Sequence, residues 1–592
     1  MALMKLLQRN CKAIRVGVWR MVQTSPAVFN TLSVKPINQR VRRRYSSFSA
    51  DGNGSGVIKS KYADVHIPMD MSLPEYLMSD FDKYGDRVAL VDGLSERSYT
   101  FRQLKDLVRR CGSGLVRHGL KPGDVCLLYK PNSPEYFISF SSVTSVGGVV
   151  VTANPLCTVD ELIYYLEQSG VSWLVTAPEL VEKVLEATNQ VPHIKGIFVI
   201  GDKSVSGCIS FTKLMKDDGS AFPSDVRVSP TDDVAAFLHS SGTTGLPKGV
   251  MLTHYNLIAN LQQLTGHGFL KLKSGLDVLA AVLPFFHMGG LLAILFVGLK
   301  QGSQIIIFPK FEPDIFLRSV SEHKVNRLFL VPPMVVFLAK HPLVDQYDVS
   351  NIDEIVCGAA PTGRDTIKAV RKRLGRSSLP VRQLYGMTEC CIVTCLTTDE
   401  KFKTGSVGTL TPNTEGKVVD VETGEILGVG QDGELCFRGP QVMKGYLNNI
   451  EATQKTITHD GWLHTGDIGH YDENGHFYVV DRFKELIKYN AFQVPPAELE
   501  NVILSMPDVK DVAVIGLPDD EAGELPKAFV VPKSDIIKPE DVIKFVEGKV
   551  TPEKKLRGGV EFIEEIPKSP SGKILRRVLK ALELERIQKG EM

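Results

Sequence analysis

A segment rich in serine, glycine and threonine, SSGTTGLPKGV at positions 240–250, contains the first residues that could do chemistry. The apolar run at 235–238 predicts a buried strand before it, and residues 253–263 predict a helix after it, with Thr253 as its N-cap. Glycines let the backbone turn its N–H groups inward, hydroxyls add donors and the lysine adds charge, which together suit a phosphate. The spacing is not that of a Walker loop. Taken alone, the segment could equally be an ordinary flexible connection.

Six further motifs follow in order along the chain. They are PFFHMGG at 284–290, GAAP at 358–361, YGMTE at 385–389, HTGD at 464–467, DRFKELIKYNAFQVPPAELE at 481–500 and PKSPSGKILRR at 567–577. With the first segment, this set resembles the signature of adenylate-forming enzymes: acyl-CoA ligases, peptide-synthetase adenylation domains and beetle luciferases. The resemblance covers residues 70 to 580, and its wording is closest to the branch of 4-coumarate:CoA ligases and luciferases.

The resemblance implies a reaction in two halves. A carboxylate attacks the α-phosphorus of ATP, with Mg²⁺, to give an acyl-adenylate and pyrophosphate, and the thiol of coenzyme A then displaces AMP to give a thioester. Phosphoryl transfer depends mainly on positioning and on neutralisation of charge. The implied fold is α/β, with a large N-terminal domain of layered α/β subdomains and a small β unit, followed by a mobile, small α+β C-terminal domain.

The family's functional residues can be carried over where the motifs match. The first segment implies a cradle for the phosphates of ATP, built from Ser240, Ser241, Gly242, Thr243, Thr244, Gly245 and Lys248. Gly358, Ala359 and Gly386 join the nucleotide site, Tyr385 packs on adenine, and Asp467 takes the ribose hydroxyls with the help of Arg482. Thr388 contacts the α-phosphate, Glu389 helps to hold Mg²⁺, and Lys573 is the catalytic lysine. Taken alone, Lys573 could be a solvated surface lysine.

The resemblance also implies that Lys573 leaves the site after adenylation, because the small domain rotates about a hinge at Lys484. Residues from Lys488 to Gln493, including Ala491 and Phe492, then line the tunnel for the pantetheine arm of coenzyme A. Asn490-Ala491-Phe492 stands where Lys-Gly-Phe is usual in the family. The added methyl of Ala491 disfavours positive φ, which puts an efficient thioester step in some doubt.

The acid pocket is the least determined part of the site. His287 matches an aromatic gate at that pocket, although a buried structural histidine is an alternative. Gly289 and Leu292 stand where 4-coumarate ligases carry polar residues for the phenol, and a buried phenolic hydroxyl needs a partner. Leu291 and Leu292 are expected to form an apolar wall, with Leu384 narrowing the pocket. An apolar acid, medium-chain fatty or aryl-alkanoic, is therefore expected; a luciferase-like oxygenase and a non-catalytic descendant are the alternatives.

Alternating strand and helix signals between residues 125 and 200 predict α/β layers with much parallel sheet. A turn-rich region before position 481 predicts a small antiparallel unit, and the remainder predicts a compact α+β domain. The Lys- and Glu-rich segment at 579–592 is expected to be a solvated helix. We therefore divide the chain into a leader and linker at 1–50, an adenylation domain at 51–482 and a mobile domain at 483–592.

Charge separates the leader from the rest of the chain. The first fifty residues hold ten Lys or Arg and no Asp or Glu, although the whole chain has a net charge of only +1. This composition is typical of an organelle transit peptide; a mitochondrial matrix address is expected, with a plastid address and a disordered basic tail as alternatives. The slightly acidic remainder favours no nucleic-acid partner, no apolar run is long enough for a bilayer, and the sequence leaves the oligomeric state open. The ten cysteines are expected to be reduced.

Overall fold

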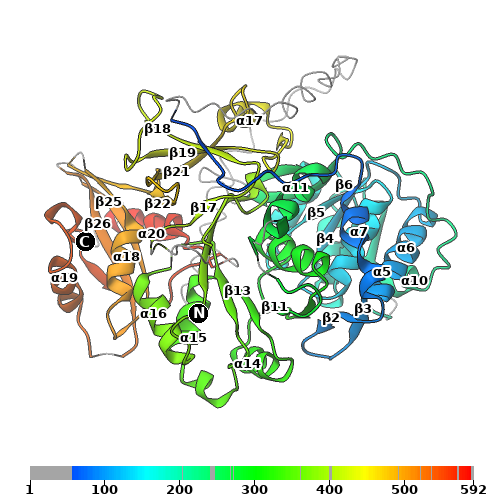
Figure 1. The fold of residues 1–592 in the computed structure, drawn as a ribbon, viewed down its shortest axis with the longest axis horizontal. Coiled ribbons are helices and arrows are strands. Elements are labelled where there is room, and N and C mark those ends of the chain that lie inside the picture. The colour runs from blue at the N-terminus through cyan, green and yellow to red at the C-terminus, as the bar shows by residue number, and fades with distance from the viewer. Residues whose placement is uncertain are drawn as a thin grey trace. The chain divides into compact units, whose positions relative to one another are not determined.

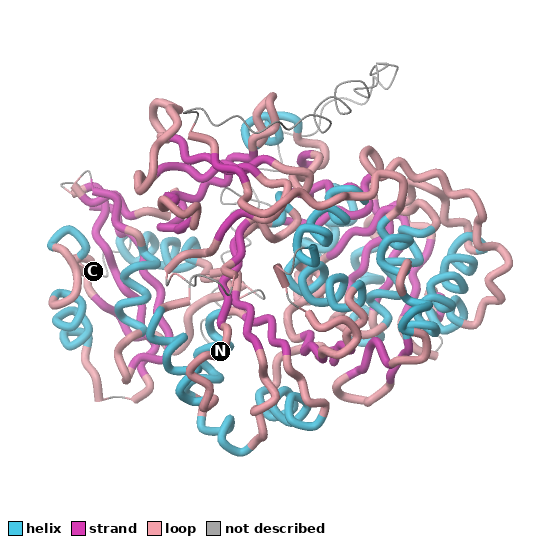
Figure 2. The backbone as a smooth tube through the Cα atoms, in the orientation of Figure 1, coloured by secondary structure: helices cyan, strands magenta, loops and turns pink. Residues whose placement is uncertain are grey.

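The computed structural model describes residues 56–592 except 203–204, 241–246, 267–268, 271, 361, 399–402, 404, 484, 491, 520–521, 535, 570–571 and 589–592. The chain divides at residues 55 and 56 into two units, of which the second holds every described residue. The predicted leader and the boundary at position 50 lie outside the described residues. The described part forms four sheets with helices packed on them (Figures 1 and 2).

An eight-stranded sheet occupies the first part of the described chain. Its strands, in spatial order, are β20 (Gly445–Tyr446), β10 (Lys248–Thr253), β9 (Val234–Ser240), β5 (Val149–Thr152), β4 (Val125–Tyr129), β6 (Val171–Thr176), β7 (Gly196–Val199) and β8 (Ile209–Ser210). The six strands from β9 to β8 run parallel. Between these strands the chain forms α7 (Glu135–Ser145), α8 (Val159–Gln168), α9 (Val181–Thr188) and α10 (Phe211–Met215), while α6 (Phe101–Arg117) precedes β4 and α11 (His254–Thr265) follows β10. The predicted α/β alternation is confirmed.

A nine-stranded sheet forms the second layer. Its order is β17 (Thr409–Leu410), β16 (Cys395–Leu396), β15 (Val381–Tyr385), β14 (Glu354–Cys357), β13 (Arg327–Leu330), β11 (Val278–Ala281), β12 (Gln304–Ile307), β2 (Val88–Asp92) and β3 (Ser98–Thr100). The strands from β15 to β2 are parallel. Its helices include α4 (Leu73–Met78), α5 (Phe81–Tyr84), α12 (Met288–Gly290), α13 (Val297–Lys300), α14 (Pro313–Glu322), α15 (Pro332–Lys340) and α16 (Arg364–Arg373). The apolar run after Gly290 is a buried π-helical turn, Leu291–Phe296, as expected for core.

The predicted antiparallel unit is a five-stranded sheet. Its order is β1 (Ile58–Lys59), β18 (Glu415–Val419), β19 (Gly433–Arg438), β21 (Leu463–Tyr471) and β22 (Phe477–Arg482), with α17 (Ile450–Thr456) between β20 and β21. Every pairing in this sheet is antiparallel. One apolar cluster of this sheet buries Leu435, Phe437 and Phe477, and a second, smaller one buries Val419, Cys436 and Trp462.

The last sheet is the α+β domain expected after position 483. It pairs β24 (Phe492–Val494), β23 (Ile487–Tyr489), β26 (Gly523–Pro532) and β25 (Val509–Asp519), and β27 (Val560–Phe562) adds to β26. The helices are α18 (Pro496–Leu504), α19 (Pro539–Glu547) and α20 (Arg576–Gln588), all visible in orange to red in Figure 1. The final helix, α20, is predicted to be solvated, but this prediction is wrong for one of its faces, which is buried. Leu579 and Glu583 are buried, and Glu583 forms an ion pair with Lys527 of β26 at 2.6 Å.

The residues that follow the phosphate segment also differ from the prediction. β10 begins at Lys248 and pairs antiparallel with β9, so residues 241–246 connect two strands of a hairpin. The helix begins only at His254. Its N-cap is Thr253, as predicted, whose hydroxyl accepts from the backbone N–H of Asn256 at 3.1 Å. The apolar side chains of Val250 and Leu252 are buried and favour the strand.

Two further expectations, on the cysteines and on membrane-spanning segments, can be compared with the described residues. Nine cysteines lie in them, and all nine are free thiols. None of the described helices has the length and hydropathy that a bilayer crossing requires.

Candidate active site

A cleft of about 510 Å³ opens beside the carboxyl ends of the parallel strands. Ten predicted site residues line it: Ser240, Lys248, His287, Ala359, Gly386, Thr388, Glu389, Asp467, Arg482 and Lys573. Four of them come shortly after a strand end, since β14 ends at Cys357 and β15 at Tyr385, and Ser240 is the last residue of β9. Loops at this edge of a parallel sheet form the ligand crevice of open α/β folds. The fold therefore brings together motifs that are separated by more than three hundred residues.

Other predicted residues lie elsewhere. Gly358 and Tyr385 are just behind the cleft lining, whereas Lys488 and Phe492 belong to strands β23 and β24 and are exposed. The predicted residues Ser241, Gly242, Thr243, Thr244, Gly245, Lys484 and Ala491 lie outside the described residues.

The phosphate end of the cleft contains a chain of three groups. The Lys248 ammonium lies over the Tyr446 ring, 5.0 Å from its centroid, and the Tyr446 hydroxyl donates to Oε1 of Glu389 at 2.9 Å. Burial and the neighbouring Glu389 raise the pKa of Tyr446, so the hydroxyl stays protonated and remains a donor. Sequence reasoning missed Tyr446, because a two-residue strand such as β20 gives no periodic signal.

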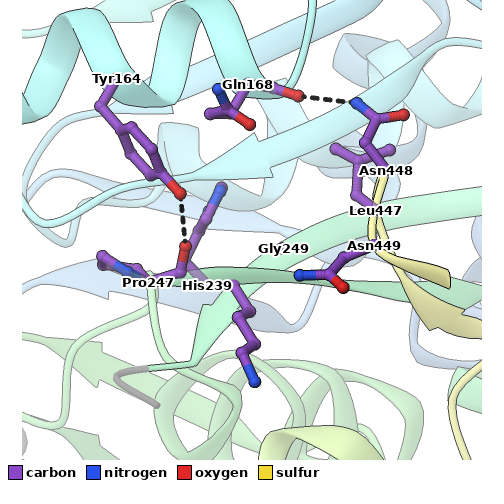
Figure 3. Close-up of a pocket in the computed structure, with 9 residues that line it drawn as sticks. Tyr164, Gln168, His239, Pro247, Gly249, Leu447, Asn448 and Asn449 are labelled. Carbon is purple, nitrogen blue, oxygen red and sulfur yellow. Dashed lines mark hydrogen bonds between the residues drawn. The ribbon is translucent and has the colours of Figure 1, made fainter. Parts of the chain in front are cut away.

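Tyr164, a residue of α8, contacts the backbone where the phosphate segment ends (Figure 3). Its hydroxyl donates to the carbonyl of Pro247 at 3.1 Å, beside a small polar cavity of about 80 Å³. Across the same cavity, the Asn448 amide donates to the carbonyl of Gln168 at 3.3 Å. The Tyr164 bond fixes the backbone directly before Lys248.

The nucleoside end is built on strands β15, β21 and β22. The Tyr385 hydroxyl donates to Oδ2 of Asp467 at 2.7 Å, and Nε of Arg482 lies 3.4 Å from Oδ1 of the same carboxylate. Asp467 and Arg482 are register partners across β21 and β22. Burial raises the pKa of Asp467, and the Arg482 charge and the Tyr385 hydroxyl oppose that shift. A buried, oriented carboxylate of this kind suits a pair of vicinal hydroxyls.

Glu434 orients the stretch of β21 that presents Asp467. Its Oε1 accepts from the backbone N–H of Gly466 at 2.9 Å, and its Oε2 lies 2.7 Å from Nδ1 of His464. Gly466 has φ of +70°, a conformation that favours glycine. The Thr465 hydroxyl donates to the carbonyl of Leu435 at 2.7 Å. Glu434 is a second residue that sequence reasoning missed, since one glutamate in a strand carries no signal of its own.

The acid end follows strand β11. Asn132, in the loop before α7, holds this segment in place. Its amide donates to the carbonyl of Leu283 at 2.9 Å, and its Oδ1 accepts from the N–H of Phe285 at 2.7 Å. Burial lowers the pKa of His287 to about 4. The imidazole is therefore neutral near pH 7, which suits an aromatic wall and excludes a role as a fixed positive charge.

The residues that line the acid end differ in part from the expectation. A Cβ built on Gly289 has no heavy atom within 4 Å, so Gly289 leaves open space, as predicted. Leu291, Leu292 and Leu384 are absent from the described lining; Leu384 packs over Gly358, where a Cβ would lie 2.6 Å from it. The apolar lining includes Leu283, Met288, Val331 and Ile392. The two leucines after Gly290 are turned into the core by the π-helical turn.

Lys573 enters the cleft on a tight loop of the small domain. The Ser569 hydroxyl accepts from the N–H of Lys573 at 3.1 Å, and the N–H of Ser569 donates to the Lys573 carbonyl at 2.7 Å. Burial and the nearby Arg482 lower the pKa of Lys573 to about 8, against the opposing charges of Glu485 and Asp467. The ammonium therefore titrates close to physiological pH.

This shift predicts an alkaline limit on adenylation. Because the ammonium is the form that neutralises developing charge, and its pKa is lowered, the active form is lost as pH rises through about 8. We expect kcat/KM for acid-dependent pyrophosphate release to fall above that pH. Lys573→Arg, whose guanidinium does not titrate in this range, should move the limit upward, and an unmoved limit would assign it to another group.

Comparisons with known proteins agree with this geometry. The model of the AMP-binding enzyme family matches residues 79–447, and that of the AMP-binding enzyme C-terminal domain matches residues 498–573. The chain is 41% identical to 4-coumarate–CoA ligase 1 of Petroselinum crispum, over 90% of this chain and 98% of that protein. It is 39% identical to the probable 4-coumarate–CoA ligase 3 of Dictyostelium discoideum, over 89% and 98%.

Solved structures give the same picture. The ATP-bound structure of MatB from Rhodopseudomonas palustris superposes with a TM-score of 0.77 at 28% identity, covering 86% of this chain and 99% of MatB. The family model alone spans more than half of the chain, and it includes every cleft residue up to β20. By its motifs, its fold and these matches, the chain belongs to the family of AMP-binding enzymes.

Proposed function

We propose that the protein is an ATP-dependent ligase that joins an apolar carboxylic acid to coenzyme A through an acyl-adenylate. The observation that carries this proposal is that Lys248, Asp467 and Lys573, which come from three separate motifs, line one cleft. Relatives over nearly the whole chain are 4-coumarate–CoA ligases, and MatB is similar in an ATP-bound form.

In the proposed first step, a carboxylate oxygen of the acid attacks the α-phosphorus of ATP and the bond to pyrophosphate breaks. Asp467 holds the ribose hydroxyls and Tyr385 both orients Asp467 and packs against adenine. Thr388 donates to the α-phosphate, Lys248 faces the departing pyrophosphate, and the Lys573 ammonium offsets charge that builds on the oxygens between the reacting groups. Such preorganised charge commonly supplies the largest part of catalysis.

Glu389 fits a role in holding Mg²⁺. Its carboxylate is buried at the cleft, with one oxygen bound by Tyr446, and Mg²⁺ characteristically uses one or two carboxylates together with substrate phosphates. When bound, the ion neutralises phosphate charge. Coenzyme A is proposed as the second substrate, entering beside the exposed residues Lys488 and Phe492 once Lys573 has withdrawn.

An assay of the full-length protein with ATP, Mg²⁺ and a panel of carboxylic acids tests the proposal. Pyrophosphate and AMP should form with apolar acids, and a thioester should form when coenzyme A is added. Light emission without a thioester would instead support the luciferase-like oxygenase, and no pyrophosphate with any acid would contradict both functions.

The open space at Gly289 predicts how acid size is limited. Gly289→Leu places a branched side chain into the cleft, where a Cβ meets no atom. We expect kcat/KM for the largest accepted acid to fall by about tenfold or more, the effect of one or two misplaced methylenes, while the smallest accepted acid is little affected. KM for ATP is the internal control, because the nucleotide binds at the other end. Unchanged kcat/KM for every acid, the largest included, would place the acid elsewhere.

We also propose a mitochondrial matrix location. The support is the composition of residues 1–50, with ten basic residues and no acidic one. A fluorescent protein fused behind these fifty residues should enter mitochondria and be processed; import into plastids or retention in the cytosol would refute this address.

A further inference from the structure

Arg576, three residues after Lys573, lies at the centre of a buried ion cluster. Its guanidinium makes two bonds to the Glu500 carboxylate, at 2.8 and 2.7 Å, and a third to Glu485. Its Nε donates to the carbonyl of Val514 on β25 at 3.1 Å. The Arg576 side chain is only 12% exposed. A forked guanidinium with this many partners fixes direction as well as distance.

Asp481 also interacts with this cluster, although it precedes position 484 in the chain whereas the other members of the cluster follow it. It belongs to β22, the strand that carries Arg482, and is 7% exposed. Its Oδ2 accepts from the N–H of Ala497 in the first turn of α18 at 3.0 Å, and its charge acts on Arg576. A carboxylate at this place caps an otherwise unpaired helical N–H. Asp481 therefore ties the strand before position 484 to the helix after it.

Lys573 itself has no comparable anchor. Among the described residues no ion pair is formed by its ammonium; Arg482 repels it, while Glu485 and Asp467 attract it. The loop hydrogen bonds to Ser569 fix the backbone of Lys573 but not the loop's position in the cleft. Gly572 lies against Val331, since a Cβ built on it would be 3.2 Å from that side chain, and the N–H of Leu575 donates to the carbonyl of Pro567 at 2.8 Å. Arg576 is the first charged side chain after Lys573 that fixes the exit of the loop.

We propose that Asp481 and Arg576 are positioning residues that hold the small domain where Lys573 reaches the cleft. The inference rests on the proposed function. Arg576 fixes the exit of the Lys573 loop to Glu485 and Glu500, and Asp481 fixes α18 to the strand of Arg482. Asp481 precedes position 484, whereas Ala497 and Arg576 follow it, so a rotation of the small domain about that position breaks the Asp481 contacts. The Arg576 pairs with Glu485 and Glu500 lie after it and persist, whereas the attraction between Arg576 and Asp481 is lost.

Measuring adenylation and thioester formation separately distinguishes this positioning role from a general effect on folding. In Asp481→Asn, which keeps size and loses charge, we expect adenylation measured as pyrophosphate release to fall about tenfold in kcat. KM for ATP should stay within about twofold. Thioester formation from a synthetic acyl-adenylate and coenzyme A, which does not need Lys573 in the cleft, should be unchanged or faster. Arg576→Gln should show the same split, and the double variant should lose little more than either single one, because both act through one contact set.

Arg577→Gln is the matched control, since Arg577 is the exposed neighbour of Arg576 on the same helix; it should behave like the wild type. If Arg576→Gln fails to fold, as judged by its melting curve, the result for Asp481→Asn alone tests the inference. Equal loss of both half-reactions in Asp481→Asn, or no loss in either, overturns the inference. Absence of adenylation in the wild type would instead refute the proposed function, which keeps the two failures distinct.

Discussion

Replacing Lys573 with alanine is expected to lower the rate of adenylation by about a thousandfold, the upper range for removal of one preorganised donor of charge. The side chain is the only part removed, since the loop is held by backbone bonds to Ser569. Thioester formation from a synthetic acyl-adenylate should change by less than about threefold, because the proposed second step takes place after Lys573 has left. Single-turnover pyrophosphate release and thioester formation measure the two steps separately.

The control for that variant is Lys580→Ala, a partly exposed lysine on α20 whose ammonium lies 3.4 Å from Glu524. It removes an equal charge from the same domain without reaching the cleft, and both half-reactions should stay at the wild-type rate. An adenylation rate in Lys573→Ala within tenfold of the wild type would contradict the assignment of the catalytic lysine.

Replacing Asp467 with alanine is the second large effect. The change removes the proposed partner of the ribose, leaves the Tyr385 hydroxyl without its acceptor and removes the charge opposite Arg482. Loss of a charged hydrogen-bonding group in a buried site costs about 1.5–3 kcal/mol per bond, so we expect kcat/KM for ATP to fall by about a hundredfold. Calorimetric titration with ATP should show the same loss in affinity.

Tyr385→Phe isolates one of these contacts. It keeps the ring and removes only the hydroxyl that orients Asp467, so kcat/KM for ATP should fall by less than about tenfold. Circular dichroism should show both variants folded. Unchanged ATP affinity in Asp467→Ala would move the nucleoside to another part of the cleft.

The parts of the fold that could be predicted from sequence are those with strong local signals. Buried strands such as Val125–Tyr129 have continuous apolar runs, and Thr253 is capped as its position before a helix implies. Ten of the predicted site residues line one cleft, and several of them come together because loops after parallel strands converge at one edge of the sheet.

The remainder depends on tertiary contacts that no short window contains. Tyr446 reaches Glu389 only because the two-residue strand β20 pairs with β10, and Asn132 holds Leu283 across 151 positions of sequence. The expected apolar wall of Leu291 and Leu292 failed for a related reason, since a π-helical turn changes which side chains face the cleft. Glu583 could be placed inside only by knowing that Lys527 lies opposite it.

The measurement that tests the central claim most directly is the fate of oxygen from the acid. An accepted acid labelled with ¹⁸O in its carboxylate is incubated with the full-length protein, ATP, Mg²⁺ and coenzyme A, and the products are analysed by mass spectrometry. Attack on the α-phosphorus predicts that label passes into AMP and that pyrophosphate stays unlabelled. Label in pyrophosphate or phosphate, or AMP without label, would contradict the acyl-adenylate and with it the roles proposed for Asp467 and Lys573.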